Sequence, residues 1–164
     1  MRSSAPVLAA LQTIPKSSLL LLLTPVLPTP GQSKSSGDPL SKTKADPFEP
    51  LGRELATHHS RIRHVPYLPN QGLSTVHRGF LQEANAVIVA ICTSDDMASL
   101  DRQMAIAREI ANLSHVPAVL VVFGDAEAIE DVRVLDAYSN VIRAGEVEKR
   151  MFEAISRTLF EARK

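Results

Sequence analysis

Short runs of consecutive apolar residues, set apart by segments with helical spacing, most constrain how this chain folds. Such runs occupy residues 18–24, 86–92 and 118–123. A short run without polar alternation is typical of a strand that is covered on both faces, as in a parallel sheet. Two further strands are expected at 62–67 and, more weakly, at 141–142. The chain is therefore predicted to build its core around five strands.

Helical segments alternate with these strands. In the longest, apolar side chains recur three and four residues apart up to Leu113, and Asp95 or Asp96 is the expected N-cap. A short helix or turn is expected over 7–14, and further helices are expected from Asp46 onward, over 74–83 and over 146–162. Parallel strands joined by helices need right-handed crossovers. The sequence thus predicts an α/β fold with a doubly wound, mostly parallel five-stranded sheet in the flavodoxin-like order 2-1-3-4-5.

The length of 164 residues suits a single domain. Residues 1–14 are expected to form a lead-in segment, and residues 15–164 one α/β domain. Between about 28 and 46, proline, glycine, serine and lysine dominate the sequence. Such a composition buries too little apolar area to offset the entropy lost on ordering. We therefore expect a flexible loop inserted after the first strand.

Charge and composition disfavour several classes of function. The formal net charge is zero, so the chain lacks the basic excess that binds nucleic acids or anionic membranes. Aromatic residues make up 4% of the chain and tryptophan is absent, which leaves few faces for stacking on sugar rings. The one cysteine, Cys92, ends an apolar run and is expected to be a buried hydrophobe, not a catalytic thiol. We expect neither nucleic acid nor membrane as a partner.

The apolar segment near the N-terminus has two interpretations. Arg2 followed by the leucines at 19–23 resembles a secretory signal, but Lys16 directly precedes the run and no small-residue cleavage pattern follows. The run is also too short to span a bilayer. A buried first strand explains the same residues better. The sequence does not assign a compartment, and the lack of a convincing signal favours the cytoplasm.

Open α/β sheets bind ligands at the carboxyl ends of their strands. The loop after the first strand, residues 24–28, contains two prolines, which lack the N–H groups that a phosphate cradle needs. The sequence carries neither a dinucleotide glycine fingerprint nor a P-loop. We therefore expect no cofactor and no metal ion.

Polar residues follow two of the other expected strands. Residues 93–96, Thr-Ser-Asp-Asp, follow the expected strand at 86–92, and an aspartate there suits either a phosphoacceptor or a helix N-cap. The lack of a second acidic cluster after the first strand favours the cap. His77, after the turn at 72–74, is either a pocket residue or a structural histidine. Spacing marks no catalytic triad and no carboxylate pair of the kind that glycosidases use. No catalytic residue is assigned.

A series of short segments points to one family. They are 19–25, FEPLGREL at 48–55, HVPY at 64–67, GLS at 72–74, ANAVIV at 84–89, LDAYS at 135–139 and LF at 159–160. In this order and spacing they resemble the C-terminal α/β domain of glycoside hydrolase family 3, especially its fungal β-N-acetylhexosaminidase-like branch. The resemblance runs from about residue 15 to the end.

This resemblance implies a non-catalytic accessory domain of a carbohydrate-active hydrolase. In that family a preceding (β/α) barrel supplies an aspartate nucleophile and, in the N-acetylglucosaminidase branch, a histidine–aspartate acid/base pair. A barrel domain, normally in the same polypeptide, is thus the implied partner, with carbohydrate as a further one. The implied substrate-cleft candidates are Asn70, Gln71, His77, Thr93, Ser94 and Asp95. Gly124-Asp125-Ala126-Glu127 departs from the family's turn after the fourth strand, which weakens a ligand role there.

Two hypotheses remain. An accessory domain, detached or truncated from its barrel, predicts an exposed apolar face where the barrel sits. An independent flavodoxin-like module that binds a small ligand or a partner predicts a polar surface. It also predicts a concave pocket near Thr24, Thr93 and Gly124. The nature of the surface discriminates between them.

Overall fold

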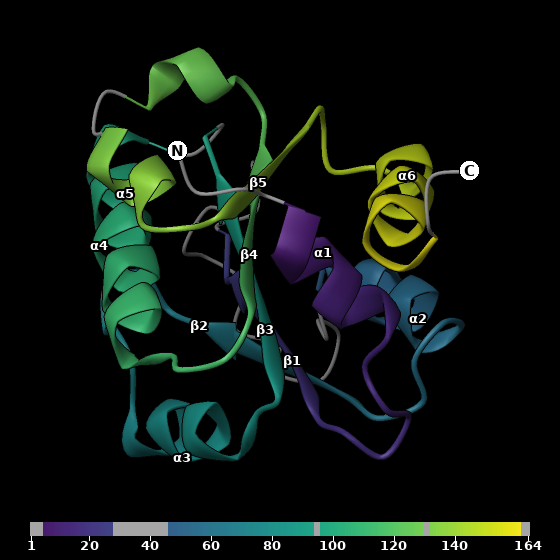
Figure 1. Cartoon of the computed structure of the whole chain (residues 1–164). Helices are drawn as coiled ribbons and strands as arrows, with labels where there is room; N and C mark the ends of the chain where they lie inside the picture. Colours follow the sequence, from purple (N-terminus) through teal and green to yellow (C-terminus); the bar gives the residue numbers. More distant parts are fainter. Residues whose placement is uncertain (1–4, 28–45, 94–95, 130–131, 162–164) are drawn as a thin grey trace, which may run out of the picture.

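A computed structural model describes residues 5–27, 46–93, 96–129 and 132–161 of the chain. Its centre is an all-parallel sheet of five strands in the order β2-β1-β3-β4-β5 (Figure 1). The strands are β1 (Leu20–Pro25), β2 (Ile62–Tyr67), β3 (Ala86–Cys92), β4 (Ala118–Phe123) and β5 (Asn140–Ala144). The predicted α/β class and the flavodoxin-like strand order are both confirmed.

Helices cover both faces of this sheet (Figure 1). One face carries α1 (Ala5–Gln12), α2 (Glu49–Ala56) and α6 (Lys149–Phe160). The other carries α3 (Thr75–Glu83), α4 (Met97–Leu113) and α5 (Val132–Asp136). A 3₁₀ turn at Ala126–Ala128 follows β4. Every described helix is too short or too polar to cross a bilayer.

The leucine run of β1 shows why the sheet is buried on both sides. Leu21 and Leu23 pack in the core under α3, α4 and α5, whereas Leu20 and Leu22 pack in the core under α1, α2 and α6. All four side chains are fully buried. Because successive side chains of a strand point to opposite faces, an uninterrupted apolar run supplies both cores at once.

Several predicted boundaries agree with the structure. β2, β3 and β4 span the predicted residues, and α3 follows its predicted cap Ser74 and ends at Glu83. The cap of α4 is Asp96, the second of the two aspartates considered. Residues 7–14, expected as a short helix or a turn, lie largely within the helix α1, whose Leu11 is buried in the core.

Other boundaries differ. β5 is longer than the expected 141–142, because five residues pair with β4. α6 begins at Lys149 and not at 146, since Glu148 is extended (φ −146°) and its carbonyl accepts the N–H of Phe152. The helix expected from Asp46 begins at Glu49. α5 and the 3₁₀ turn were not predicted. The expected loop at 28–46 lies outside the described residues, apart from Asp46.

Candidate functional site

The carboxyl edge of the sheet is where an open α/β fold offers a site, and the β2–α3 connection forms one part of it. The N–H groups of Gln71 and Gly72 both donate to the carbonyl of Leu68 at 3.0 Å, and Gly72 adopts a positive φ of 74° that favours glycine. Asn70 and Gln71 are exposed on this turn. Their amides are free to contact a ligand or a partner.

His77 fastens this turn to the sheet. Its Nδ1 accepts the backbone N–H of Ser74 at 3.0 Å, and the Ser74 hydroxyl oxygen accepts the N–H of His77, which completes a capping box at the start of α3. Its Nε2 lies 2.9 Å from the carbonyl of Pro66, to which it donates. Both ring nitrogens therefore have partners within the chain, and a ligand would have to displace one of them.

Thr93 follows β3 and lies apart from that turn. Its backbone N–H donates to the carbonyl of Phe123 at 2.9 Å, and its side chain is half-buried. β1 separates β2 from β3, so about 10 Å divides β3, which Thr93 follows, from β2, which leads into the turn with Asn70 and Gln71. Ser94 and Asp95, also candidates, lie outside the described residues. The structure thus groups the β2–α3 candidates together but not with Thr93.

How β1 and β3 part at their carboxyl ends was not predicted from the sequence. Their pairing ends at Leu23 and Val89, and we call the gap beyond this pair the fork. With Leu23 opposite Val89, a continuing parallel ladder would need the N–H of residue 25 to reach the carbonyl of Ala90. Residue 25 is proline and has no N–H. The Tyr67 hydroxyl takes that role and donates to the Ala90 carbonyl at 2.8 Å.

Gln103 fills the next position of the fork. Its Oε1 accepts the N–H of Cys92 at 2.8 Å, and its Nε2 donates to the carbonyl of Cys92 at 3.3 Å. Gln103 and Tyr67 are both fully buried. The strand order reverses between β1 and β3, which is where such folds usually take a ligand. Here, side chains of the chain itself occupy that level of the fork.

The signals for this fork were present in the sequence but only in part. A proline at the end of a buried run indicates a broken ladder, and a glutamine on the apolar stripe of a helix indicates a buried polar contact. Neither identifies its partner. Tyr67 and Ala90 are 23 residues apart, and only the three-dimensional register brings them together.

A polar cluster lies on the other face, where β1, β2 and the start of α2 meet. The Nε2 of His64 lies 2.7 Å from Thr24 Oγ1 and 3.7 Å from Asp46 Oδ2. Burial lowers the pKa of His64, while the carboxylates of Asp46 and Glu49 act in the opposite direction. Both neighbours approach the same ring nitrogen, and Thr24 is fully buried, so this is not a nucleophilic triad.

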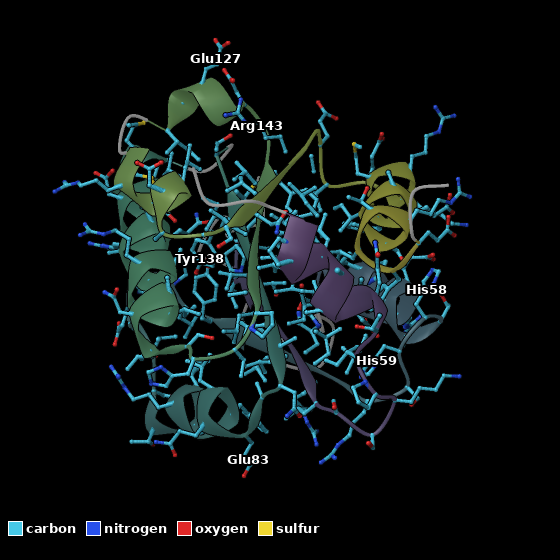
Figure 2. All side chains as sticks on the ribbon, viewed as in Figure 1. His58, His59, Glu83, Glu127, Tyr138 and Arg143 are labelled. Atoms are coloured by element: carbon cyan, nitrogen blue, oxygen red, sulfur yellow. The ribbon has the colours of Figure 1, made fainter. Side chains whose placement is uncertain are left out.

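The two tyrosines share one core. The hydroxyl of Tyr138 donates to the carbonyl of Ala107 at 2.5 Å, on the side of the sheet that α4 covers (Figure 2). Burial raises the pKa of Tyr138 and that of Tyr67 well above the ordinary value. Both hydroxyls therefore stay protonated at neutral pH and act as donors.

His58 and His59 follow α2, on the side towards α6 (Figure 2). Their rings stack on Phe160, and His59 Nε2 lies 2.7 Å from the carbonyl of Ser18. These contacts join the end of α2 to the end of α6 and to the segment before β1. Within the described part of the chain, no three histidine, cysteine, aspartate or glutamate side chains converge on a possible metal position.

Four exposed apolar side chains lie at the carboxyl edge of the sheet. Val26 follows β1, Leu68 follows β2, and Val76 and Met97 lie in the first turns of α3 and α4, which start at that edge. Their exposed fractions are 45%, 39%, 59% and 58%. Leu113, at the opposite edge, is 39% exposed. We call the first four the edge residues.

Described residues line two grooves between helices. The larger, of about 580 Å³, runs between α2 and the start of α6, and its walls include Pro50, Arg53, Lys149 and Phe152. The smaller, of about 450 Å³, lies between the ends of α3 and α4. The lining residues of the larger groove include none of Thr24, Thr93 and Gly124, around which the sequence had suggested a pocket.

Comparison with known proteins adds little to this geometry. The chain matches no family model and no curated protein. Among solved structures it is similar to a metal-soaked flavodiiron core, Flv1, from Synechocystis sp. PCC6803, with 10% sequence identity and a TM-score of 0.49 over 90% of this chain. The chain spans 35% of the length of that protein. A likeness of this degree carries no information about activity.

Proposed function

We propose that this chain is a non-catalytic accessory domain of a β-N-acetylhexosaminidase-like glycoside hydrolase and packs against a (β/α) barrel that carries the catalytic residues. The proposal joins the resemblance to glycoside hydrolase family 3 with one structural observation, the edge residues. In that family the barrel supplies the nucleophile and the acid/base pair, so this chain has no catalytic step of its own to perform.

The edge residues favour a docking role. A single exposed valine or leucine is ordinary on a protein surface, because there is not enough polar surface to cover a fold. Four large apolar side chains on one edge are less ordinary, and such gatherings mark protein contacts. Tyr67 and Gln103 fill the fork between β1 and β3 and are fully buried. A partner would therefore contact the outer surface of the carboxyl edge and not the fork.

Asn70 and Gln71 extend this proposal towards the substrate. They are exposed on the turn next to Leu68, one of the edge residues. Amide side chains both donate and accept hydrogen bonds, as sugar hydroxyl groups require. A barrel docked on the edge would bring this turn close to its own substrate cleft, where it would bind carbohydrate without taking part in bond cleavage.

The decisive experiment measures turnover and association in turn. The purified chain is expected not to hydrolyse a chromogenic β-N-acetylglucosaminide. It is expected to bind the isolated barrel domain of a family 3 β-N-acetylhexosaminidase in a calorimetric titration. Robust turnover by the chain alone would exclude the accessory role, because it would demand a catalytic site in these residues.

A second candidate rests on the larger groove. At about 580 Å³, its volume lies in the range of small-molecule sites, which favours an independent flavodoxin-like binding module. Nuclear magnetic resonance shifts on adding N-acetylglucosamine test this. Shifts confined to residues of α2 and α6, together with no affinity for the barrel domain, would favour the second candidate.

A further inference from the structure

One side chain, His64, connects three segments that are distant in sequence. It belongs to β2, bonds Thr24 at the end of β1, and faces Asp46 just before α2. Its ring also lies close to α2: a Cβ on Gly52 would make an ordinary van der Waals contact with Nδ1, at 3.6 Å. The imidazole therefore sits in a joint between the sheet and α2.

Asp46 is hydrogen-bonded to the first residues of α2, so a displacement of Asp46 would also displace the start of that helix. Its Oδ1 accepts the backbone N–H of Phe48 at 2.9 Å, and its carbonyl accepts the N–H of Glu49 at 3.1 Å. Both bonds hold the turn that leads into the helix. Its other carboxylate oxygen, Oδ2, is the one that faces His64, at a distance too long for a hydrogen bond.

Among the described residues, the charges that act on the ring are both negative. Asp46 and Glu49 are the carboxylates that act on His64 from the α2 side. Glu49 is itself paired with Arg53 on the outer surface of α2. From β1 the ring meets Thr24, which has no charge and is fully buried. Asp46 is thus the nearest anion that can respond to a charge on the imidazole.

We propose that His64 is a pH-sensitive latch between the sheet and α2. With a neutral imidazole, the Thr24 hydroxyl is its partner and Asp46 stands off. When the ring takes up a proton from solvent, Nε2 carries an N–H whichever tautomer was present before, and Thr24 Oγ1 can only accept. The positive ring then attracts the Asp46 carboxylate into hydrogen-bond range and clamps the start of α2 to β2.

We expect the latch to close below neutral pH and to change the shape of the larger groove. Desolvation of the ring opposes the charge more strongly than the carboxylates favour it, so the pKa lies below the ordinary 6.5. Pro47 and Pro50, next to Asp46 and in the first turn of α2, line the groove between α2 and α6. Clamping Asp46 would therefore shift one wall of that groove. This inference does not depend on the proposed function.

Nuclear magnetic resonance of the full chain from about pH 4 to about pH 8 tests the latch. The ring signals of His64 and the backbone amide of Phe48 are expected to shift with one common midpoint, below 6.5. In Asp46→Asn that midpoint moves lower, because the attraction is lost, and the Phe48 amide no longer follows it. In His64→Gln the Phe48 amide is expected to show no step at the wild-type midpoint.

Two results would overturn the latch. One is a wild-type Phe48 amide whose chemical shift does not change at the midpoint of the His64 ring signals. This result can be observed without any variant. The other is an Asp46→Asn midpoint equal to that of the wild type. Glu49→Gln serves as a control: it is expected to lower the midpoint less and to leave the coupling of the Phe48 amide intact.

Discussion

Pro25 ends β1 with a residue that cannot donate, and Tyr67 supplies the missing donor from a different strand. The hydroxyl of Tyr67 lies in the core and reaches the carbonyl of Ala90, which would otherwise be buried without a partner. An unsatisfied buried carbonyl costs more than an ordinary hydrogen bond gains. One proline thus explains why the neighbouring strand carries a buried phenol, directly opposite it in the register.

Tyr67→Phe is predicted to lower the free energy of unfolding by about 1–3 kcal/mol, the usual cost of leaving a buried polar group unpaired. In a Pro25→Ala background the backbone N–H of residue 25 returns, and the same substitution is expected to cost less. Urea denaturation of the four proteins in this cycle gives the difference. An equal cost in both backgrounds would show that Tyr67 does not replace the ladder bond.

Tyr138 gives the chain a sensitivity to alkaline pH. Its raised pKa means that above about pH 10 the unfolded state releases a proton that the folded state retains. The stability due to this group is present below pH 10 and falls as the pH rises further. Urea denaturation at increasing pH, followed by circular dichroism, should show a shallower decline in Tyr138→Phe than in the wild type. Identical slopes would contradict this.

At the scale of elements, the boundaries that the sequence predicted well have strong local signals. Ser74 and Asp96 each accept a backbone N–H at the start of a helix, and β3 is bounded by polar residues at both ends. The start of α6 was placed too early because residues 146–148 have helical propensity, whereas the chain leaving β5 is still extended at Glu148.

The candidate site was less predictable than the fold for a physical reason. Its contacts join residues far apart in sequence, such as Thr24 and His64, which are 40 positions apart. Periodicity places each residue on a strand or helix but does not give the register between strands, and hydrogen-bond partners depend on that register. His77 illustrates the same limit, since its second partner, Pro66, lies on another element.

Asp96→Ala is predicted to destabilise the chain by about 1 kcal/mol, the typical value of an N-cap. The Asp96 carboxylate accepts the N–H of Ser99 at 2.8 Å and lies at the positive end of the α4 dipole. Thermal unfolding measures the effect. Asp101→Ala, an exposed aspartate within the same helix, is the matched control and is expected to change the midpoint much less.

At the scale of the whole molecule, the two sets of helices close both faces of the sheet and leave its edges as the surfaces that differ. The carboxyl edge bears the four edge residues, and the amino edge bears Leu113 and the smaller groove. A domain that docks on one edge needs no rearrangement of either core. Because the edge residues lie outside both cores, substitutions there can test association with a partner without unfolding the chain.

Val76→Asp and Met97→Asp are predicted to weaken binding to the barrel domain by at least about tenfold each, if burial of each side chain contributes on the order of 1.5 kcal/mol or more. Both positions lie in the first turn of a helix, where an acidic residue suits the dipole and the fold should persist. Calorimetric titration measures the affinities. Leu113→Lys, at the other edge, is expected to bind like the wild type.

The placement of the tyrosines has an optical consequence. The chain has two tyrosines and no tryptophan, and both tyrosines lie in the core under α3, α4 and α5. Intrinsic ultraviolet emission therefore reports on one face of the sheet only, and loosening of α1, α2 and α6 would leave it almost unchanged. A tryptophan introduced at Phe152, in the opposite core, would give each face its own signal and reveal whether the two cores melt together.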